Sequence, residues 1–168
     1  MGSSVGISKV NTYEGLDKAI EVALSFDDRV IIEKGIKGRE IECGVLEGET
    51  LMVSAVGEVI SSHEFYDYTA KYTDDGQEKM MIPAKNLDKE TISCIQDMAS
   101  RAFKIHGCRG LARVDFFLED DTQRLIINEI NTLPGMTIFS MFPALFKAEG
   151  ISYEKLIDLL IASANTSS

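Results

Sequence analysis

The sequence has few cysteines, and their spacing excludes the sites that cysteines usually build. Cys43, Cys94 and Cys108 are the three cysteines in 168 residues, and no two of them form a CxxC pair. An odd count without that spacing predicts neither a disulfide framework nor a zinc site. The two histidines, His63 and His106, are far apart and show no partner pattern. We therefore expect reduced, buried thiols in a cytoplasmic protein, and structural or surface histidines.

Long apolar runs and a surplus of positive charge are missing as well. There is no run of 18 or more apolar residues and no basic-then-apolar leader, which predicts neither a membrane span nor a signal peptide. Seventeen Lys and Arg against 27 Asp and Glu give a net charge of −10, which argues against binding nucleic acid. A small phosphate ligand remains possible, because it needs only a few donors and a metal.

The apolar patterns predict an α+β architecture with a mostly antiparallel sheet and flanking helices. Apolar residues at helical spacing predict helices at 15–26, 88–105, 143–147 and 153–164, with Asp88 as the N-cap of the second. Extended patterns predict strands at 29–34, 40–48, 51–60, 110–119 and 124–131. Residues 61–83 have no steady period and are too long for a simple turn, which is typical of a functional lid or a disordered loop.

The last two predicted strands carry polar side chains that could face each other. Because strand side chains alternate, Arg113 and Asp115 share one face of their strand, and Ile127, Glu129 and Asn131 share one face of the next. A three-residue turn would place Asp115 opposite Glu129 and Arg113 opposite Asn131. A two-residue turn would shift the register and separate them.

Two facing acids repel each other unless a cation lies between them. Asp, Glu and Asn offer only oxygen donors, which suits a hard ion such as Mg²⁺. The alternative from the residues alone is an ion pair of Arg113 with Asp115 or Glu129 in a half-solvated sheet. Both interpretations remain open at this point.

Two further segments suggest contacts with an anion. The small residues of GSSVG, Gly2 to Gly6, permit close backbone approach and offer hydroxyl and amide donors to a phosphate, although serine-glycine starts are also common in expression tags. In HEFYDYTAKYTDDG, Lys71 lies among aromatic residues and could close over an anionic intermediate, or the tyrosines could simply pin a surface loop. Pro134-Gly135 would leave free backbone N–H groups where an oxyanion could be held.

The chain resembles the D-alanine–D-alanine ligases of the ATP-grasp superfamily from Gly2 to about Ala164. Six segments, taken in order, carry the resemblance: GSSVG, EKGIKGRE, EFYDYTAKY, GCRGLARVDFF, NEINTLPGMT and SMFP. The resemblance implies an ATP-grasp fold and a ligase of peptidoglycan precursor synthesis. In that family, one D-alanine carboxylate takes the γ-phosphate of ATP to give an acyl phosphate. The amine of a second D-alanine then attacks it. ATP, two Mg²⁺ ions (with Mn²⁺ as a substitute) and a homodimeric parent are also implied.

The resemblance assigns roles around the hairpin that agree with its local chemistry. Asp115, Glu129 and Asn131 match the magnesium ligands. Arg113 and the backbone of Gly135 match the groups that stabilise the tetrahedral oxyanion.

The remaining matched positions contact the substrates and ATP. They are Ser140 for the carboxylate of the second amino acid, Ser3, Ser4, Val5 and Gly6 in the phosphate-covering loop, Lys71 and Tyr72 in the ω-loop, Glu33, Lys34 and Ile36 at the adenine hinge, and Glu40 at the ribose.

The resemblance also predicts how the chain is organised. Residues 1–35 correspond to the end of the central ATP-binding domain, and residues 36–168 to the C-terminal ATP-grasp domain with the ω-loop and the magnesium site. Full-length members carry an N-terminal domain before the serine loop, so the chain is expected to be a C-terminal fragment that cannot catalyse ligation alone. Tyr72 and the SMF sequence at 140–142 favour D-alanine as second substrate. The alternatives are D-serine or D-lactate, another ATP-grasp ligase, and a magnesium-nucleotide module without turnover.

Overall fold

The computed structural model describes residues 4–60 and 79–166 of the chain. The chain divides into two compact units, Met1–Ile36 with Ser61–Lys79, and Lys37–Ile60 with Met80–Ser168. Among the predicted site residues, Ser3, Lys71 and Tyr72 lie outside the described residues. No helix of the described residues has the length and apolar character that crossing a membrane requires.

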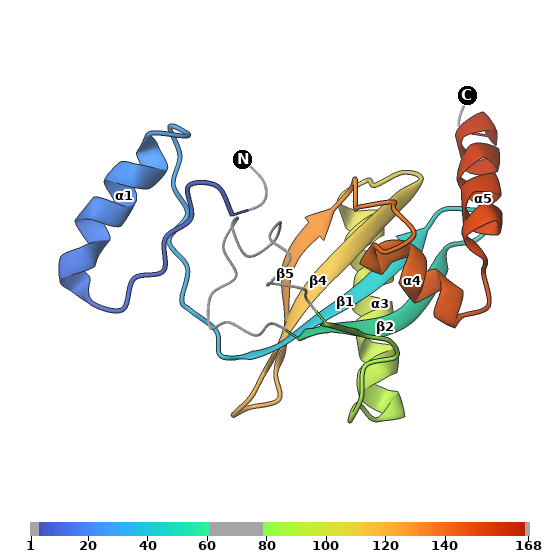
Figure 1. Ribbon diagram of the computed structural model, residues 1–168, viewed down its shortest axis with the longest axis horizontal. Helices are drawn as coiled ribbons and strands as arrows, with labels where there is room; N and C mark the ends of the chain where they lie inside the picture. The colour runs from blue at the N-terminus through green and yellow to red at the C-terminus, as the bar shows by residue number, and fades with distance from the viewer. Residues whose placement is uncertain (1–3, 61–78, 167–168) are drawn as a thin grey trace. The chain divides into compact units, whose positions relative to one another are not determined.

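The first unit contains a short 3-10 helix, η1 (Tyr13–Gly15), followed by the helix α1 (Leu16–Leu24) (Figure 1). The predicted helix is therefore confirmed, although none of its residues is buried. The predicted strand at 29–34 is wrong: these residues have no regular structure, and Ile31 and Ile32 are 82% and 64% exposed. A strand needs a hydrogen-bonding neighbour, and no described strand pairs with this segment.

The second unit is built on a five-stranded sheet with the strand order β3-β2-β1-β4-β5 (Figure 1). The strands are β1 (Gly38–Leu46), β2 (Met52–Ile60), β3 (Lys79–Met81), β4 (Leu111–Glu119) and β5 (Leu125–Asn131). The pairs β1–β2, β1–β4 and β4–β5 are antiparallel, as predicted. Only β3 was not predicted, since its three residues lie inside the segment that shows no period.

The helix α3 (Lys89–Ile105) covers one face of this sheet, and α4 (Met141–Ala148) covers part of the opposite face (Figure 1). Alternation along β1 explains the two layers. Ile41 and Cys43 point into the core that includes Ile95 of α3, whereas Leu46 packs with Phe142 of α4. A last helix, α5 (Tyr153–Thr166), packs against α4.

Two glycines allow α4 to approach the sheet closely. A Cβ atom at Gly44 would lie 2.8 Å from the ring of Phe146, and one at Gly57 would lie 2.7 Å from Leu145. Gly44 is also paired with Arg113 across β1 and β4, so α4 lies on the same face of the sheet as Arg113. Because these two glycines have no side chain, α4 can pack beside a polar part of that face.

The hairpin of β4 and β5 has one of the two registers that the sequence left open, but neither of the two turn lengths considered. Four residues, 120–123, separate Glu119 from Arg124, whose carbonyl accepts the Glu119 N–H at 3.0 Å. A β-bulge between Asp115 and Phe116 then shifts the strand pairing by one residue, and this shift places Asp115 opposite Glu129. The bulge also changes the faces of β5. Ile127 lies opposite the core residue Phe116, so the expectation that it shares a face with Glu129 is wrong.

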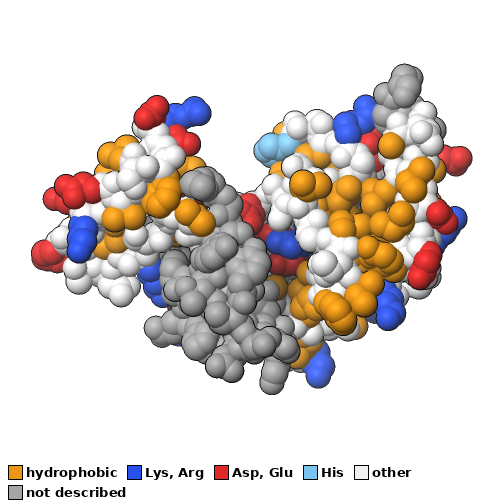
Figure 2. Space-filling view, turned by 45° about the horizontal axis from the view of Figure 1, so that its top comes forward, with side chains coloured by type: hydrophobic (Ala, Val, Ile, Leu, Met, Phe, Trp, Pro, Cys, Tyr) orange, Lys and Arg blue, Asp and Glu red, His pale blue; other side chains and the backbone are white. Residues whose placement is uncertain are grey.

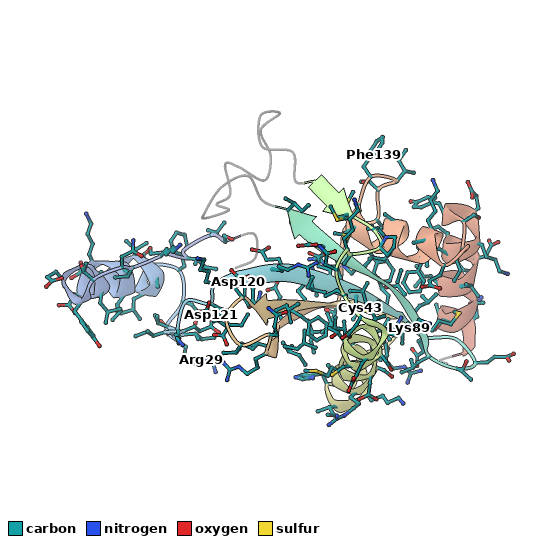
Figure 3. All side chains as sticks on the ribbon, turned by 90° about the horizontal axis from the view of Figure 1, so that it is seen from below. Arg29, Cys43, Lys89, Asp120, Asp121 and Phe139 are labelled. Atoms are coloured by element: carbon teal, nitrogen blue, oxygen red, sulfur yellow. The ribbon has the colours of Figure 1, made fainter. Side chains whose placement is uncertain are left out.

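All three cysteines are free, and the prediction that they are buried holds fully for Cys43 alone. Cys43 lies between the sheet and α3 (Figure 3), and burial raises the pKa of its thiol to about 12. Cys94 is exposed and Cys108 is half-buried. His106 is exposed, in agreement with a surface role.

Candidate functional site

Polar side chains from three neighbouring strands form a row on the sheet face opposite α3. Glu42 of β1 is paired with Asp115 of β4, and Asp115 is paired with Glu129 of β5. One step along the strands, Arg113 is paired with Asn131. Directly opposite residues of a sheet point to the same face, so the register brings these five side chains to one area.

Arg113 joins two of these acids directly. Its Nε and Nη2 atoms donate to the two oxygens of Asp115, each at 2.7 Å. Oε2 of Glu42 lies 3.0 Å from the same Nε, which is an ion-pair contact. In this cluster Asp115 and Glu42 are buried, at 8% and 9% exposed, and the Arg113 side chain between them is half-buried, at 18%. The ion pair between Arg113 and Asp115 that was an alternative at the sequence level is therefore present.

The charges of the cluster shift the pKa of its members. Burial raises the pKa of the Asp115 carboxyl, and the charge of Glu129 adds to this, while the hydrogen bonds from Arg113 act in the opposite direction. Burial alone would lower the pKa of the Arg113 guanidinium, but the hydrogen bonds to Asp115 and the charges of Glu42 and Glu129 raise it. Three carboxylates around one guanidinium leave an excess of negative charge, which a bound cation would offset.

The segment after β5 folds back on itself around Ser140. Its Oγ accepts a hydrogen bond from Thr137 N at 3.1 Å and lies 2.9 Å from Thr137 Oγ1. A Cβ atom at Gly135 would lie 2.8 Å from the same oxygen, so only glycine fits there without a shift. The fold thus brings Gly135 and Ser140 together. Tyr153 of α5 supports this turn, since its hydroxyl donates to Met136 O at 2.7 Å.

Asn131, the last residue of β5, makes a local hydrogen bond with the backbone that follows it. Asn131 Oδ1 accepts a hydrogen bond from Leu133 N at 3.2 Å, which turns the backbone directly after β5. Beyond it, Leu133, Ile138 and Phe139 are 85%, 65% and 79% exposed, and Phe139 projects from the fold (Figure 3). The amide oxygen proposed as a metal ligand therefore already accepts one hydrogen bond.

The predicted nucleotide contacts are distributed over both units. In the first unit, Ser4 and Gly6 have φ angles of 59° and 79°, and Ile7 N donates to Ser4 O at 3.3 Å, so this segment forms a tight turn with Val5 at its centre. A Cβ atom at Gly6 would lie 2.7 Å from the ring of Phe26.

The predicted adenine hinge belongs to irregular chain of the first unit. Glu33 and Lys34 are exposed there, and Ile36 is half-buried. Glu40, the predicted ribose contact, is an exposed residue of β1 in the second unit. The roles of these residues stay predictions.

Sequence reasoning assigned no role to Glu42, which the structure places in the cluster. The signal was its position, since Glu42 lies between Ile41 and Cys43 among the last six residues of β1, all of which are buried. An acid in such a strand needs a partner. Within the described residues no group of three or more His, Cys, Asp or Glu is arranged to hold a metal, so a metal site here would require Asn131 as a third ligand.

The fold and this site define an α+β domain of the ATP-grasp type. Residues 1–162 match the family described as "D-ala D-ala ligase C-terminus", and the chain belongs to that family. Its relatives include the D-alanine–D-alanine ligase of Ruminiclostridium cellulolyticum, which is 50% identical over 163 residues, covering 97% of this chain and 43% of the relative. The chain spans less than half the length of the curated relatives it matches.

Solved structures agree with this assignment. The VanG D-Ala:D-Ser ligase from Enterococcus faecalis superimposes with a TM-score of 0.82 at 41% identity, covering 95% of this chain and 46% of that protein. A D-alanine–D-alanine ligase from Bacillus anthracis, solved in complex with ATP, gives a TM-score of 0.76 at 31% identity, covering 94% of this chain and 50% of that protein.

Proposed function

We propose that the chain forms the carboxy-terminal part of the catalytic site of an ATP-dependent ligase that joins two D-alanines. The observation that supports it most is the half-buried Arg113–Asp115 pair, opposite Glu129 and Asn131, in a chain 50% identical to a D-alanine–D-alanine ligase. In the proposed reaction, a D-alanine carboxylate attacks the γ-phosphate of ATP and releases ADP. The amine of the second D-alanine attacks the resulting acyl phosphate, and phosphate leaves as the peptide bond forms.

The residues of the polar row suit a divalent cation by their chemistry. Asp115, Glu129 and Asn131 supply oxygen donors only, as Mg²⁺ prefers. Asp115 and Glu129 are cross-strand neighbours, and the raised pKa of Asp115 reflects burial and this repulsion. When bound, Mg²⁺ would screen the phosphate oxygens of ATP and polarise the group that is transferred. Mn²⁺ has similar ligand preferences and is a useful probe of the same site.

Arg113 and Gly135 are proposed to stabilise the negative charge of the tetrahedral intermediate. Arg113 supplies a half-buried guanidinium whose raised pKa keeps it charged. Gly135 supplies backbone beside Ser140, where a side chain would clash. The hydroxyl of Ser140 is proposed to bind the carboxylate of the second amino acid.

The nucleotide is proposed to contact the turn at Ser4–Gly6, the hinge at Glu33, Lys34 and Ile36, and Glu40, together with Ser3, Lys71 and Tyr72 outside the described residues. The ATP complex of the Bacillus anthracis relative supports nucleotide binding by this fold. We propose a cytoplasmic enzyme, which the three free cysteines support. D-Serine is the second candidate for the attacking amino acid, because the VanG D-Ala:D-Ser ligase is 41% identical to this chain.

The test compares the chain with a chimera in which it replaces the matching 163 residues of the Ruminiclostridium cellulolyticum ligase. We expect the chimera to form D-alanyl-D-alanine, ADP and phosphate, and the chain alone to form none. In the chimera, Arg113→Met should lower kcat by about 10²–10³-fold, as loss of an oxyanion contact does. Gly135→Ala should lower it less, since it displaces Ser140 without removing a donor.

Parallel assays with D-serine and D-lactate identify the second substrate. A higher kcat/KM for D-serine than for D-alanine would replace the proposed substrate and keep the reaction. A folded chimera that hydrolyses no ATP with any of the three acceptors would contradict the proposed ligase function. Dipeptide formation by the 168-residue chain alone would contradict the expectation that it needs the rest of the site.

A further inference from the structure

We propose that Glu42 is a positioning residue that holds the Arg113 guanidinium while Asp115 turns toward a divalent cation. This inference rests on the proposed function, because it requires the metal site of that function. It assigns a role to a buried acid for which neither the sequence motifs nor the family resemblance gave one.

The geometry shows two carboxylates within reach of one donor. Nε of Arg113 carries a single hydrogen, which it donates to Asp115 Oδ1 at 2.7 Å. Glu42 Oε2 lies 3.0 Å from the same nitrogen, already within hydrogen-bonding range. A small rotation of the guanidinium would therefore redirect the Nε–H hydrogen bond from Asp115 to Glu42 with the backbone in place.

Asp115 needs such an exchange before it can bind a metal. Both of its oxygens accept hydrogen bonds from Arg113, so its carboxylate faces the guanidinium. Turning one oxygen toward a cation breaks at least one of these bonds. A guanidinium that is only 18% exposed is costly to leave without a partner, so Asp115 would remain on Arg113 unless another acid took its place. Glu42 is that acid, since β1 places it directly opposite Asp115.

The charges of the cluster agree with this exchange. Glu42, Asp115 and Glu129 carry three negative charges around the single positive charge of Arg113. With Glu42 paired to Arg113, the other two acids are left to balance one divalent cation, and the cluster becomes neutral. In this arrangement Arg113 stays on the sheet face beside the metal, where the proposed oxyanion contact requires it.

The experiment measures Mn²⁺ binding to the 168-residue chain from the electron paramagnetic resonance signal of the free ion. Glu42→Gln removes the charge and should weaken Mn²⁺ binding roughly tenfold or more, as loss of a group that orients a metal ligand typically does. Glu42→Asp keeps the charge but shortens the side chain, so it should not restore binding. Glu58→Gln is the matched control, because Glu58 binds Arg39 at 2.6 and 2.8 Å on the α3 face of the sheet.

A double-mutant cycle separates a role through Arg113 from a direct one. In an Arg113→Met background Asp115 has no guanidinium to leave, so Glu42→Gln should change the Mn²⁺ affinity by less than about twofold. An undiminished loss in that background, or full recovery with Glu42→Asp, would overturn the inference. If Arg113→Met does not fold, as judged by circular dichroism, the Glu42→Asp result decides.

The outcomes also separate this inference from the proposed function. If the wild-type chain binds Mn²⁺ and Glu42→Gln binds it equally well, the positioning role fails and the proposed metal site stands. If Glu58→Gln weakens binding as much as Glu42→Gln, the loss is a general effect of destabilisation and the positioning role again fails. If the wild-type chain binds no Mn²⁺, the proposed metal site fails, and the role of Glu42 fails with it.

Discussion

The helices α1 and α3 show similar amphipathic patterns, yet they differ in what they bury. In the second unit, which contains the sheet and is the sheet unit of the comparison, α3 buries Ile95, Ala99, Ala102 and Phe103 against the strands. In the other unit, α1 buries no residue, and none of the described residues 4–36 is buried. Figure 2 shows hydrophobic side chains on the surface around α1, and Val22, Leu24 and Phe26 are 40–49% exposed.

The difference shows which part of folding a local pattern determines. Apolar residues at helical spacing are sufficient to predict a helix, but burial requires a second apolar layer facing it. The sheet supplies that layer for α3. Because burial of apolar surface is the main favourable term in folding, we expect the sheet unit to account for most of the stability of the chain.

The largest expected effect compares the same substitution in both units. Phe146→Ala removes a ring that is 1% exposed and should lower the free energy of unfolding by about 3–5 kcal/mol. Phe26→Ala removes a ring that is 47% exposed and should lower it by less than about 1 kcal/mol. Urea unfolding followed by circular dichroism measures both. Equal losses would mean that the first unit has a core of its own, and the comparison would fail.

A smaller effect is expected from the glycine that lets α4 pack on the sheet. The Cβ atom of Gly44→Ala would meet the rings of Phe146 and Phe142 at 2.8 and 3.1 Å. Overpacking of this kind should cost about 1–3 kcal/mol, measured by the same urea unfolding. Gly48→Ala is the control, since its Cβ meets Met52 at an ordinary 3.4 Å and the cost should stay within about 0.5 kcal/mol. A neutral Gly44→Ala would show that α4 can move away freely.

Two serines, one in each unit, test the same contrast for hydrogen bonds. Ser54 is fully buried, where its Oγ accepts from Gly44 N and donates to Ala55 O, both at 2.7 Å. Ser54→Ala leaves a buried N–H without its partner and should cost about 1–2 kcal/mol. Ser25→Ala removes an exposed bond to Val22 O and should cost less than about 0.5 kcal/mol in the same measurement. Comparable losses would show that solvent does not replace the exposed bond.

The sequence was sufficient to predict elements whose pattern is local. Extended patterns predicted β1, β2, β4 and β5, and helical spacing predicted α1 and α3. It failed for residues 29–34, because an apolar run does not reveal whether a neighbouring strand exists. It also could not reveal the bulge at Asp115, which depends on the pairing of two strands.

The candidate site was predicted in its composition but not in its contacts. The register that places Asp115 opposite Glu129 and Arg113 opposite Asn131 was one of two that the sequence left open, and it is the one observed, although the turn has four residues and not three. Glu42 was missed, because it comes from a strand that is adjacent in space but distant in sequence. The metal and oxyanion roles of these residues stay predictions that the chimera and the Mn²⁺ titrations test.

The smallest expected effect concerns how the two helices begin. The Asp88 side chain accepts a hydrogen bond from Thr91 N at 2.8 Å and caps α3, whereas α1 begins after Gly15 without a side-chain cap. Hydrogen bonds from the Thr91 backbone and hydroxyl lower the pKa of Asp88 below its ordinary 3.8. The ionised form therefore stabilises the folded chain. This contribution is complete above the ordinary value and is lost as the pH falls through the lowered one.

We therefore expect Asp88→Ala to lower the urea midpoint at pH 7, and the difference from wild type to shrink as the pH is lowered below 4. Asp88→Asn still accepts the hydrogen bond but does not titrate, so it separates the cap from the charge. It should retain much of the midpoint at pH 7, and its advantage over Asp88→Ala should not depend on pH. A difference between wild type and Asp88→Ala that stays constant down to pH 3 would mean that the charge contributes nothing. The cap would then stabilise α3 through its hydrogen bond alone, which α1 lacks.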